Sequence, residues 1–541
     1  MLSRKSCLGS LAAAATLIAS PIAIGGDVGP SATTEPYLVA THPGVQLKSI
    51  LTVGDSVQGY RMVGAPDGLG AYANGDGTFT LLMNHELGER AGAVRAHGAR
   101  GAFVSEWKIR ARGLVVLAGR DLVRSASDVH TFDKASGVYH AGPDTWARFC
   151  SADLAPPSAF SYREFGTRDR LFLTGEESAP FFSSDHGRAF AFVATGPSAG
   201  QAWELPHLGR IAFENVVASP HAQRKTLVFG MDDASLDTGI RNVSTVCRVF
   251  GLMTCNLPPS ELYLYIGDKT AEGNPIERAG LANGKLFGLQ VAVNGKAMPG
   301  EDPAFVFGSA ATGRITKARF GLHAFGDVSR KTGNALQRES IEAGVTQFMR
   351  IEDGAWDPRA SQRNDFYFVT TGNFAAGDNY RSSRLWRVRF DDVERPEAGG
   401  EIEMLLDSAG PAGKPGFEML DNIAIDRRGR LILQEDTGTA GRLSKVWLYD
   451  LATRKLVMIA EHNPKFFKPG EPGFLTANKE SSGVIDAAEV LGDGWFLLVV
   501  QAHYRHADPD LAQGGQLLAI YVAPSIGGES DGRDGRTQGN R

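Results

Sequence analysis

The chain has 541 residues, of which 43% are hydrophobic and 22% are charged, and its formal net charge is −5. This composition is typical of a globular protein and excludes a disordered chain. No basic cluster with interleaved aromatic residues occurs, so we expect no nucleic-acid partner.

The first 25 residues form a separate segment. Arg4 and Lys5 precede an apolar, alanine-rich run from Cys7 to Ile24, and two glycines follow. This order predicts a secretory signal peptide over residues 1–25, because the apolar run is short for a membrane span. A retained membrane anchor is the alternative. We expect a periplasmic or secreted protein without stable membrane insertion, in which residues 26–40 form a linker.

Export changes what the cysteines can do. Cys7 would leave with the signal peptide. Cys247 and Cys255 are eight residues apart and could close a disulfide in an oxidising compartment. Cys150 is then left without a partner. It is either a small buried core residue or a thiol used for metal binding or catalysis.

Short runs of alternating apolar residues, separated by Gly, Asp-Gly and Asn-Gly turns, follow from residue 41 onward. The clearest predicted strands are Thr78–Met83, Leu171–Thr174, Ala189–Ala194, Thr226–Met231, Glu261–Ile266, Phe366–Thr371, Arg384–Phe390, Arg430–Gln434, Lys445–Tyr449, Trp495–Gln501 and Gln516–Tyr521. Long helical periodicity is scarce. We therefore predict an all-β domain over residues 41–524, followed by a disordered tail over residues 525–541.

Six of these strands end in acids, amides or histidine. The endings are Asn84-His85-Glu86, Glu176-Glu177, Asp232-Asp233, Gly372-Asn373, Glu435-Asp436 and Gln501-Ala502-His503. Six endings predict a six-bladed β-propeller, in which the inner strands converge on one channel. Blades of about 40–45 residues cover about half of the chain, so we expect long insertions, notably Arg148–Arg170 and Gly273–Gly344. A β-sandwich or two smaller β domains is the alternative.

Acids at strand ends would line such a channel. Calcium takes six to eight oxygen ligands and therefore suits carboxylates from several blades. The candidates are Glu86, Glu176, Glu177, Glu214, Asp232, Asp233, Glu352, Asp353, Asp421, Glu435, Asp436 and Glu480. Ordinary solvated turns would explain any one of them alone. Side chains alternate along a strand, so at most one acid of the pair Glu176–Glu177 should face the channel. His85 and His503 are candidate metal ligands or proton donors. The alternative is that each only bonds nearby backbone.

Eight motifs, in order, carry a resemblance to a known family. They are PDGLGAY (66–72), LLMNHE (81–86), FCSADL (149–154), LTGEE (173–177), GRIAFEN (209–215), RIEDGAWDP (350–358), EMLDNIAID (418–426) and ESSGVID (480–486). From Gly64 to Tyr521 the chain resembles the PhoX-type alkaline phosphatase family. The resemblance implies a six-bladed propeller with a calcium (Ca2+) and ferric iron (Fe3+) centre in its channel. It also implies hydrolysis of phosphomonoesters without a serine nucleophile.

The resemblance also implies roles for single residues. Cys150 would be a thiolate ligand of iron, and the carboxylate ligands would be Glu177, Glu214, Glu352 and Asp421. Glu86 and Glu480 are further candidate metal ligands among the acids at strand ends. Arg350 would contact the substrate phosphate, because a planar guanidinium pairs with two phosphate oxygens.

The chain departs from the family at three places. Ala152-Asp153 stands where the family has Gly-Gly, the loop Pro156–Arg170 lacks the family's tryptophans, and Ile351 replaces a usual proline. The chain thus resembles a divergent branch. We expect a monomeric, exported, metal-dependent phosphomonoesterase that acts on small phosphate esters. A non-catalytic calcium-binding propeller and a lactonase-like metal hydrolase are the alternatives; the lactonase would need neither Cys150 nor Arg350.

Overall fold

The computed structural model describes residues 26–178, 185, 187–233, 260–302, 306–372, 383–408, 416–439 and 441–528. The predicted signal peptide, Cys247, Cys255, Asn373 and residues 529–541 of the predicted tail lie outside these ranges. Within them, none of the helices combines the length and the apolar character that a membrane crossing requires.

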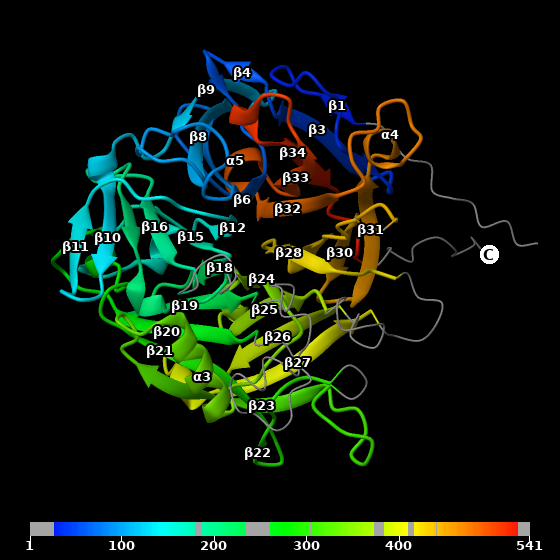
Figure 1. Cartoon of the computed structure of the whole chain (residues 1–541). Coiled ribbons are helices and arrows are strands. Elements are labelled where there is room, and N and C mark those ends of the chain that lie inside the picture. The colour runs from blue at the N-terminus through cyan, green and yellow to red at the C-terminus, as the bar shows by residue number, and fades with distance from the viewer. Residues whose placement is uncertain are drawn as a thin grey trace, which may run out of the picture.

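The sheets are arranged like the blades of a wheel around a common centre (Figure 1). The strands nearest the centre are β6 (Pro66–Ala73), β12 (Phe149–Asp153), β18 (Phe213–Ala218), β24 (Ile351–Trp356), β28 (Leu420–Ile425) and β32 (Lys479–Asp486). These inner strands contact one another in that order, and β32 contacts β6, so the ring is closed. The prediction of an all-β propeller is confirmed.

The first two inner strands each begin an antiparallel meander. The strands β7 (Thr78–His85), β8 (Phe103–Arg110) and β9 (Val115–Asp121) follow β6. The strands β15 (Leu171–Glu176), β16 (Ala189–Val193) and β17 (Ala202–Glu204) pair outward from β12, and β10 (Val129–Asp133) and β11 (Val138–Ala141) extend that sheet. Residues 148–170, predicted as an insertion, therefore include the inner strand β12, whereas the following residues, with the separate pair β13 (Ser161–Tyr162) and β14 (Phe165–Gly166), lie outside the blades.

The next two blades are joined into one sheet. One contains β18, β19 (Lys225–Asp232), β20 (Leu262–Asp268) and β21 (Lys285–Val293), with β22 (Lys296–Ala297) at its edge, and the other contains β24, β25 (Asp365–Thr370), β26 (Arg384–Phe390) and β27 (Gly400–Asp407). Strand β23 (Lys317–Gly326) pairs with β21 on one side and β27 on the other. Residues 273–344, predicted as an insertion, thus supply β21 and this bridge.

The last two blades include strands from the beginning of the chain. One contains β28, β29 (Arg430–Glu435), β30 (Lys445–Asp450), β31 (Lys455–His462) and β2 (Leu38–Ala40); the other contains β32, β33 (Trp495–Arg505), β34 (Gln513–Val522), β3 (Val45–Thr52) and β1 (Asp27–Val28). A separate pair joins β4 (Ser56–Val57) and β5 (Tyr60–Arg61). Within the described ranges the α-helices are α2 (Pro275–Arg278), α3 (Gly333–Ala343), α4 (Pro464–Phe467) and α5 (Ala488–Leu491).

Residues 26–40 were predicted to be a linker, but they pack on the last two blades. Strand β1 pairs with β3, and β2 pairs with β31. Tyr37 is buried against the rings of Phe466 and Phe467, and its backbone N–H donates to Gln516 Oε1 at 2.7 Å. At the other end Ile526 is buried, so the packed chain passes the predicted boundary at residue 525.

The cores lie between neighbouring blades. Trp356, predicted as a blade-core residue, is buried among the rings of Phe229, Phe366 and Phe390. Burying such a side chain stabilises the fold by about 1.5–3 kcal/mol, so the aromatic layers hold the blades in register. Because the blades are fixed in this way, the channel they surround has a defined shape.

Candidate metal centre

Each inner strand carries a possible metal donor as its second residue. These six residues, which we call the donor ring, are Asp67, Cys150, Glu214, Glu352, Asp421 and Glu480. The shared position follows from the repeat, because each inner strand starts at the same end of the channel. Each blade therefore contributes one donor at the same level of the channel.

A β-bulge lies at this position in five of the six inner strands. In β12, Phe149 pairs with Glu176 and Ala152 pairs with Thr174, so that two residues of β12 stand opposite one residue of β15. The same shift occurs in β6, β18, β24 and β28, whereas in β32 it comes later, after Ser482. A bulge bends the strand and re-aims side chains, and bulges are frequent beside active sites. The bulges in the backbone therefore determine the direction in which the donor side chains point.

The residue before the inner strand is left-handed in four blades. Ala65 has φ 46°, Arg148 has φ 50°, Arg350 has φ 60° and Met419 has φ 49°. Residues other than glycine rarely adopt this conformation, and each costs about 1–3 kcal/mol unless its surroundings compensate. The recurrence in four blades shows a shared turn that leads the chain into the channel.

The second strands of several blades end beside the donor ring. Glu86, Glu177, Asp233 and Asp436 each follow the last residue of such a strand. The residue before each of them belongs to the blade. Glu176, for example, accepts from Arg188 Nε at 2.8 Å, away from the channel donors. Of this pair, only Glu177 lies with the possible metal ligands, as alternation along the strand predicts.

The donors form three overlapping groups. Within each group the ligand atoms lie within 4.8 Å of one another, and the groups are Asp67–Glu86–Cys150, Cys150–Glu177–Glu214 and Glu214–Glu352–Asp421. Neighbouring groups share Cys150 or Glu214. The arrangement offers up to three adjacent positions for cations.

Hydrogen bonds between blades hold the donors in place. Cys150 Sγ donates to Asp67 Oδ2 at 3.5 Å, and Asp67 also accepts from Ser482 Oγ at 2.6 Å. Ser151, next to Cys150, donates to Glu214 Oε1 at 2.8 Å and accepts from Asn422 Nδ2 at 2.5 Å. Because each bond links residues of different blades, the geometry depends on the whole ring.

The donor groups are electrostatically crowded. Burial, together with neighbouring acids, raises the pKa values of Asp67, Glu214 and Asp421 well above their ordinary values. Burial raises the pKa of Glu177 to about 7, although the Arg148 guanidinium acts in the opposite direction. Burial also raises the pKa of the Cys150 thiol, with Asp67 as the next cause. So many buried acids ionise together only if cations lie among them.

The donor set fits calcium and iron. Carboxylate oxygens from separate loops are the ligands that calcium prefers, and a thiolate suits a transition metal such as iron. A bound cation also favours the ionised thiol and carboxylates that burial disfavours. The residues present therefore have the chemistry that both predicted metals need.

Two guanidiniums lie against carboxylates of this site. Arg350 bonds Asp233 through Nε at 3.0 Å and Nη2 at 2.7 Å, and Nη2 is 2.9 Å from Glu352 Oε1. Arg148 Nη1 is 2.9 Å from Glu86 Oε1, and its Nη2 contacts the Glu177 carboxylate. Arg148 was not predicted. Its signal in the sequence was its position directly before a donor-bearing strand, which Arg350 shares.

The structure brings together six of the seven predicted ligands. They are Cys150, Glu177, Glu214, Glu352, Asp421 and Glu86. Glu480 lies outside the three groups and pairs with His503 Nε2 at 3.3 Å. Asp67 was missed, although it is the second residue of a motif used for the resemblance. His85 is buried, stacks on Phe103 and bonds Gly64 O and Ser105 Oγ, so it belongs to the blade.

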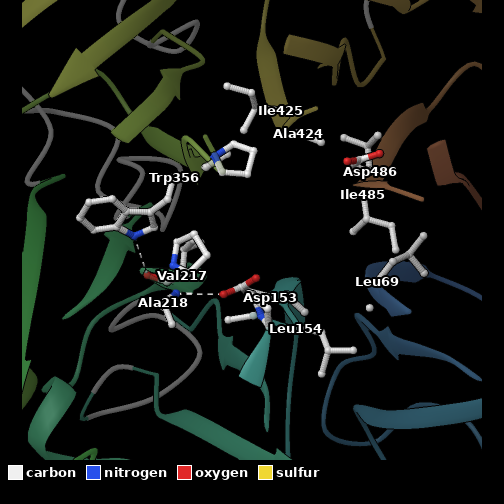
Figure 2. Close-up of a pocket in the computed structure, with 18 of the residues that line it drawn as sticks. Leu69, Asp153, Leu154, Val217, Ala218, Trp356, Ala424, Ile425, Ile485 and Asp486 are labelled. Carbon is white, nitrogen blue, oxygen red and sulfur yellow. Dashed lines mark hydrogen bonds between the residues drawn. The ribbon is translucent and has the colours of Figure 1, made fainter. Parts of the chain in front are cut away.

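A separate cavity of about 280 Å³ lies farther along the inner strands (Figure 2). The carboxylates of Asp153 and Asp486 point into it from different blades. Burial raises their pKa values, to about 7 for Asp153 and about 6 for Asp486. Apolar residues such as Leu69 and Ile425 form much of its wall. Its lining includes no member of the three donor groups, so it is distinct from the candidate metal centre.

Comparison with known proteins gives structural similarity only. No family model and no curated protein matches the sequence. PhoX from Pseudomonas fluorescens, solved in complex with vanadate, a transition state analogue, has a TM-score of 0.59 and 13% sequence identity, covering 92% of this chain and 97% of that one. An α-L-arabinanase from Penicillium chrysogenum, complexed with arabinobiose, has a TM-score of 0.35 and 9% identity, covering 85% and 97%. The similarity to PhoX supports the propeller fold.

Proposed function

We propose that this chain is an exported, metal-dependent phosphomonoesterase that hydrolyses small phosphate esters. The observation that carries the proposal is the set of three overlapping donor groups with two arginines against their carboxylates. The fold similarity to a protein that binds vanadate, an analogue of a phosphoryl-transfer transition state, supports the same chemistry.

The ligand types of the three donor groups suit different metals. The groups that contain Cys150 would hold iron, and the all-carboxylate group Glu214–Glu352–Asp421 would hold calcium. Such cations supply charge stabilisation to a phosphoryl group during displacement. The seven ligands of these groups come from five blades and can position this charge without reorganising.

The chain's own contribution to substrate binding centres on Arg350. Asp233 accepts two hydrogen bonds from this guanidinium and fixes its orientation. The left-handed backbone at Arg350 and its ion pair with Glu352 further limit where the side chain can lie. A planar guanidinium held in this way is suited to pair with two phosphate oxygens.

The presence of arginines beside the donors favours a phosphate ester over a lactone. A lactone substrate is neutral, and its hydrolysis gives no reason to place two guanidiniums at a metal centre. A phosphomonoester is a dianion, and a guanidinium together with metal cations can balance its two negative charges.

The test combines metal analysis with an assay. The purified protein should contain calcium and iron, and it should hydrolyse an aryl phosphate with a rate that falls at least about 100-fold after chelation, because the charge stabilisation is lost. Glu177→Gln should lower both metal content and activity, whereas the matched control Glu176→Gln should keep the metals. A metal-loaded protein that hydrolyses no phosphate ester from acid to alkaline pH would favour a calcium-binding propeller without catalysis. Hydrolysis of lactones alone would favour the lactonase.

A further inference from the structure

We propose that Arg148 is a second phosphate-binding residue, which together with Arg350 makes the site selective for dianionic phosphate monoesters over diesters. The inference rests on the proposed function, and it adds a recognition residue from a second blade.

Arg148 and Arg350 occupy equivalent positions in two blades. Each directly precedes an inner strand, β12 or β24, and each has a left-handed backbone, with φ 50° and 60°. Each is followed two residues later by a donor, Cys150 or Glu352, at a bulge of the same type. The repeat therefore places both guanidiniums at the same level relative to the donor ring.

The two guanidiniums contact carboxylates of adjoining donor groups. Arg148 contacts Glu177 directly, and its Nε also donates to the Glu177 carbonyl oxygen at 3.0 Å. Arg350 Nη2 lies 2.9 Å from Glu352 Oε1, and Glu352 belongs with Glu214 to the adjoining donor group. Glu177 belongs to the central group with Cys150 and Glu214. Each positive charge therefore lies beside a donor group that contains Glu214.

The guanidiniums are more accessible than the carboxylates that hold them. The side chain of Arg148 is 32% exposed, whereas those of Glu86 and Glu177 are 10% and 17% exposed. The side chain of Arg350 is 25% exposed, against 1% for Asp233. An anion that enters from solvent can reach both guanidiniums while the carboxylates stay behind them.

Two guanidiniums match the shape and charge of a monoester. A phosphate monoester has three non-bridging oxygens and two negative charges, and one guanidinium fork pairs with only two oxygens. A diester has two non-bridging oxygens and a single charge. A second guanidinium therefore has an oxygen to bind in the monoester, but it adds little for the diester.

A purely structural role for Arg148 makes different predictions. In that role the guanidinium would only neutralise Glu86 and Glu177 and hold them for the metals. Its replacement would then lower metal content and stability together with activity. A phosphate-binding role changes anion affinity while the metal content stays constant.

The experiment uses the full-length exported protein loaded with its metals. Arg148→Lys keeps the charge but removes the planar fork, and Arg148→Asn removes the charge with a residue that tolerates a left-handed backbone. The control is Arg188→Lys in the same blade, where the guanidinium binds Glu176 and Asp144 outside the donor groups. Bound metals are counted by elemental analysis, and affinities for vanadate and inorganic phosphate are measured by calorimetry.

We expect Arg148→Lys to keep its metals and to bind both anions about 10-fold or more weakly, because charge-assisted bonds to phosphate are lost. The KM for an aryl phosphate should rise more than kcat falls, the preference for monoester over diester should shrink, and Arg188→Lys should behave as wild type. Unchanged anion affinity in both Arg148 variants would overturn the inference, and so would loss of metal from Arg148→Lys. A wild-type protein that carries its metals but binds neither anion would overturn the proposed function itself.

Discussion

At the scale of single residues, neighbouring positions have different roles. Glu176 and Glu177 are adjacent acids, yet the first bonds Arg188 within its blade and the second lies among the metal donors. Asp153 is three residues from Cys150, but its carboxylate points into the separate cavity rather than toward the donor groups. The cause is the alternation of side chains along a strand, modified by the bulge.

Asp153 should make stability depend on pH. Burial raises the pKa of Asp153 from 3.8 to about 7. The hydrogen bond from Ala218 N–H opposes this shift, and the charge of Asp353 adds to it. The folded state therefore prefers the protonated acid, and this contribution to stability is present below about pH 4 and is lost as the pH rises through 7. At pH 8, Asp153→Asn should therefore unfold at a higher temperature than wild type. We expect a gain of about 1–2 kcal/mol in unfolding free energy, less than the full pKa shift implies, because the side chain is partly exposed.

The measurement is thermal unfolding of both proteins at pH 5 and pH 8. The advantage of Asp153→Asn should grow with pH, since the asparagine can still accept the Ala218 N–H but never ionises. An advantage that is equal at both values would show that Asp153 does not carry the raised pKa.

Site residues could be predicted from the sequence where a residue of a ligand type stands near a strand end within a motif. Cys150, Glu177 and Glu352 could be identified because each is a plausible ligand near a strand end within a motif. Arg148 was missed, because the equivalence of its position with that of Arg350 becomes clear only once the strands are paired. Glu480 was also predicted as a ligand by its position, and its carboxylate lies 3.3 Å from His503 Nε2.

At the scale of the element, the bulged inner strand is the unit that carries the chemistry. Its bulge requires neighbouring inner strands to approach closely. A Cβ on Gly68, beside Asp67 in β6, would lie 2.3 Å from Ala152 N and 2.6 Å from the Ser151 carbonyl carbon in β12. Backbone atoms cannot move aside as a flexible side chain can, so glycine is required here.

Gly68→Ala should therefore separate β6 from β12. We expect lower metal content, because Asp67 and Cys150 belong to one donor group, and a loss of about 1–3 kcal/mol in unfolding free energy from overpacking. The control is Gly321→Ala in β23, where a Cβ would meet nothing within 4 Å. Denaturant unfolding and elemental analysis test both variants. Full metal content in Gly68→Ala would contradict the prediction.

The sequence predicted strands better than the connections between blades. Alternating apolar residues identify each strand locally, so most of the predicted segments coincide with strands of the structure. The bridge made by β23 depends on pairing with β21 and β27, which lie far from one another in sequence. Residues 26–40 contain few strand signals, and they became part of the fold because buried Tyr37 and Leu38 meet residues near the other end of the chain.

At the scale of the whole molecule, the two ends of the chain close the ring together. Strand β3 pairs with β34 along its length, and β2 adds to the neighbouring blade. Removing residues 26–52 should leave the β34 edge unpaired and prone to association. We expect such a protein to aggregate and to lose most of its metal, whereas removal of residues 26–29, which contain only β1, should leave metal content unchanged. Gel filtration and elemental analysis would show the difference, and a monomeric, metal-loaded protein lacking β3 would contradict it.

The pairing of β3 with β34 also determines when the metal centre can form. Asp67 and Asp421 are 354 residues apart in the sequence, and the ring that holds them is completed when β34 pairs with β3. Contacts of such long sequence separation form slowly. Under the proposed function, a chain still being synthesised would lack part of its set of metal ligands. The ions available to the completed ring would then be those of the compartment in which β34 joins β3, so the place of folding would select the metals.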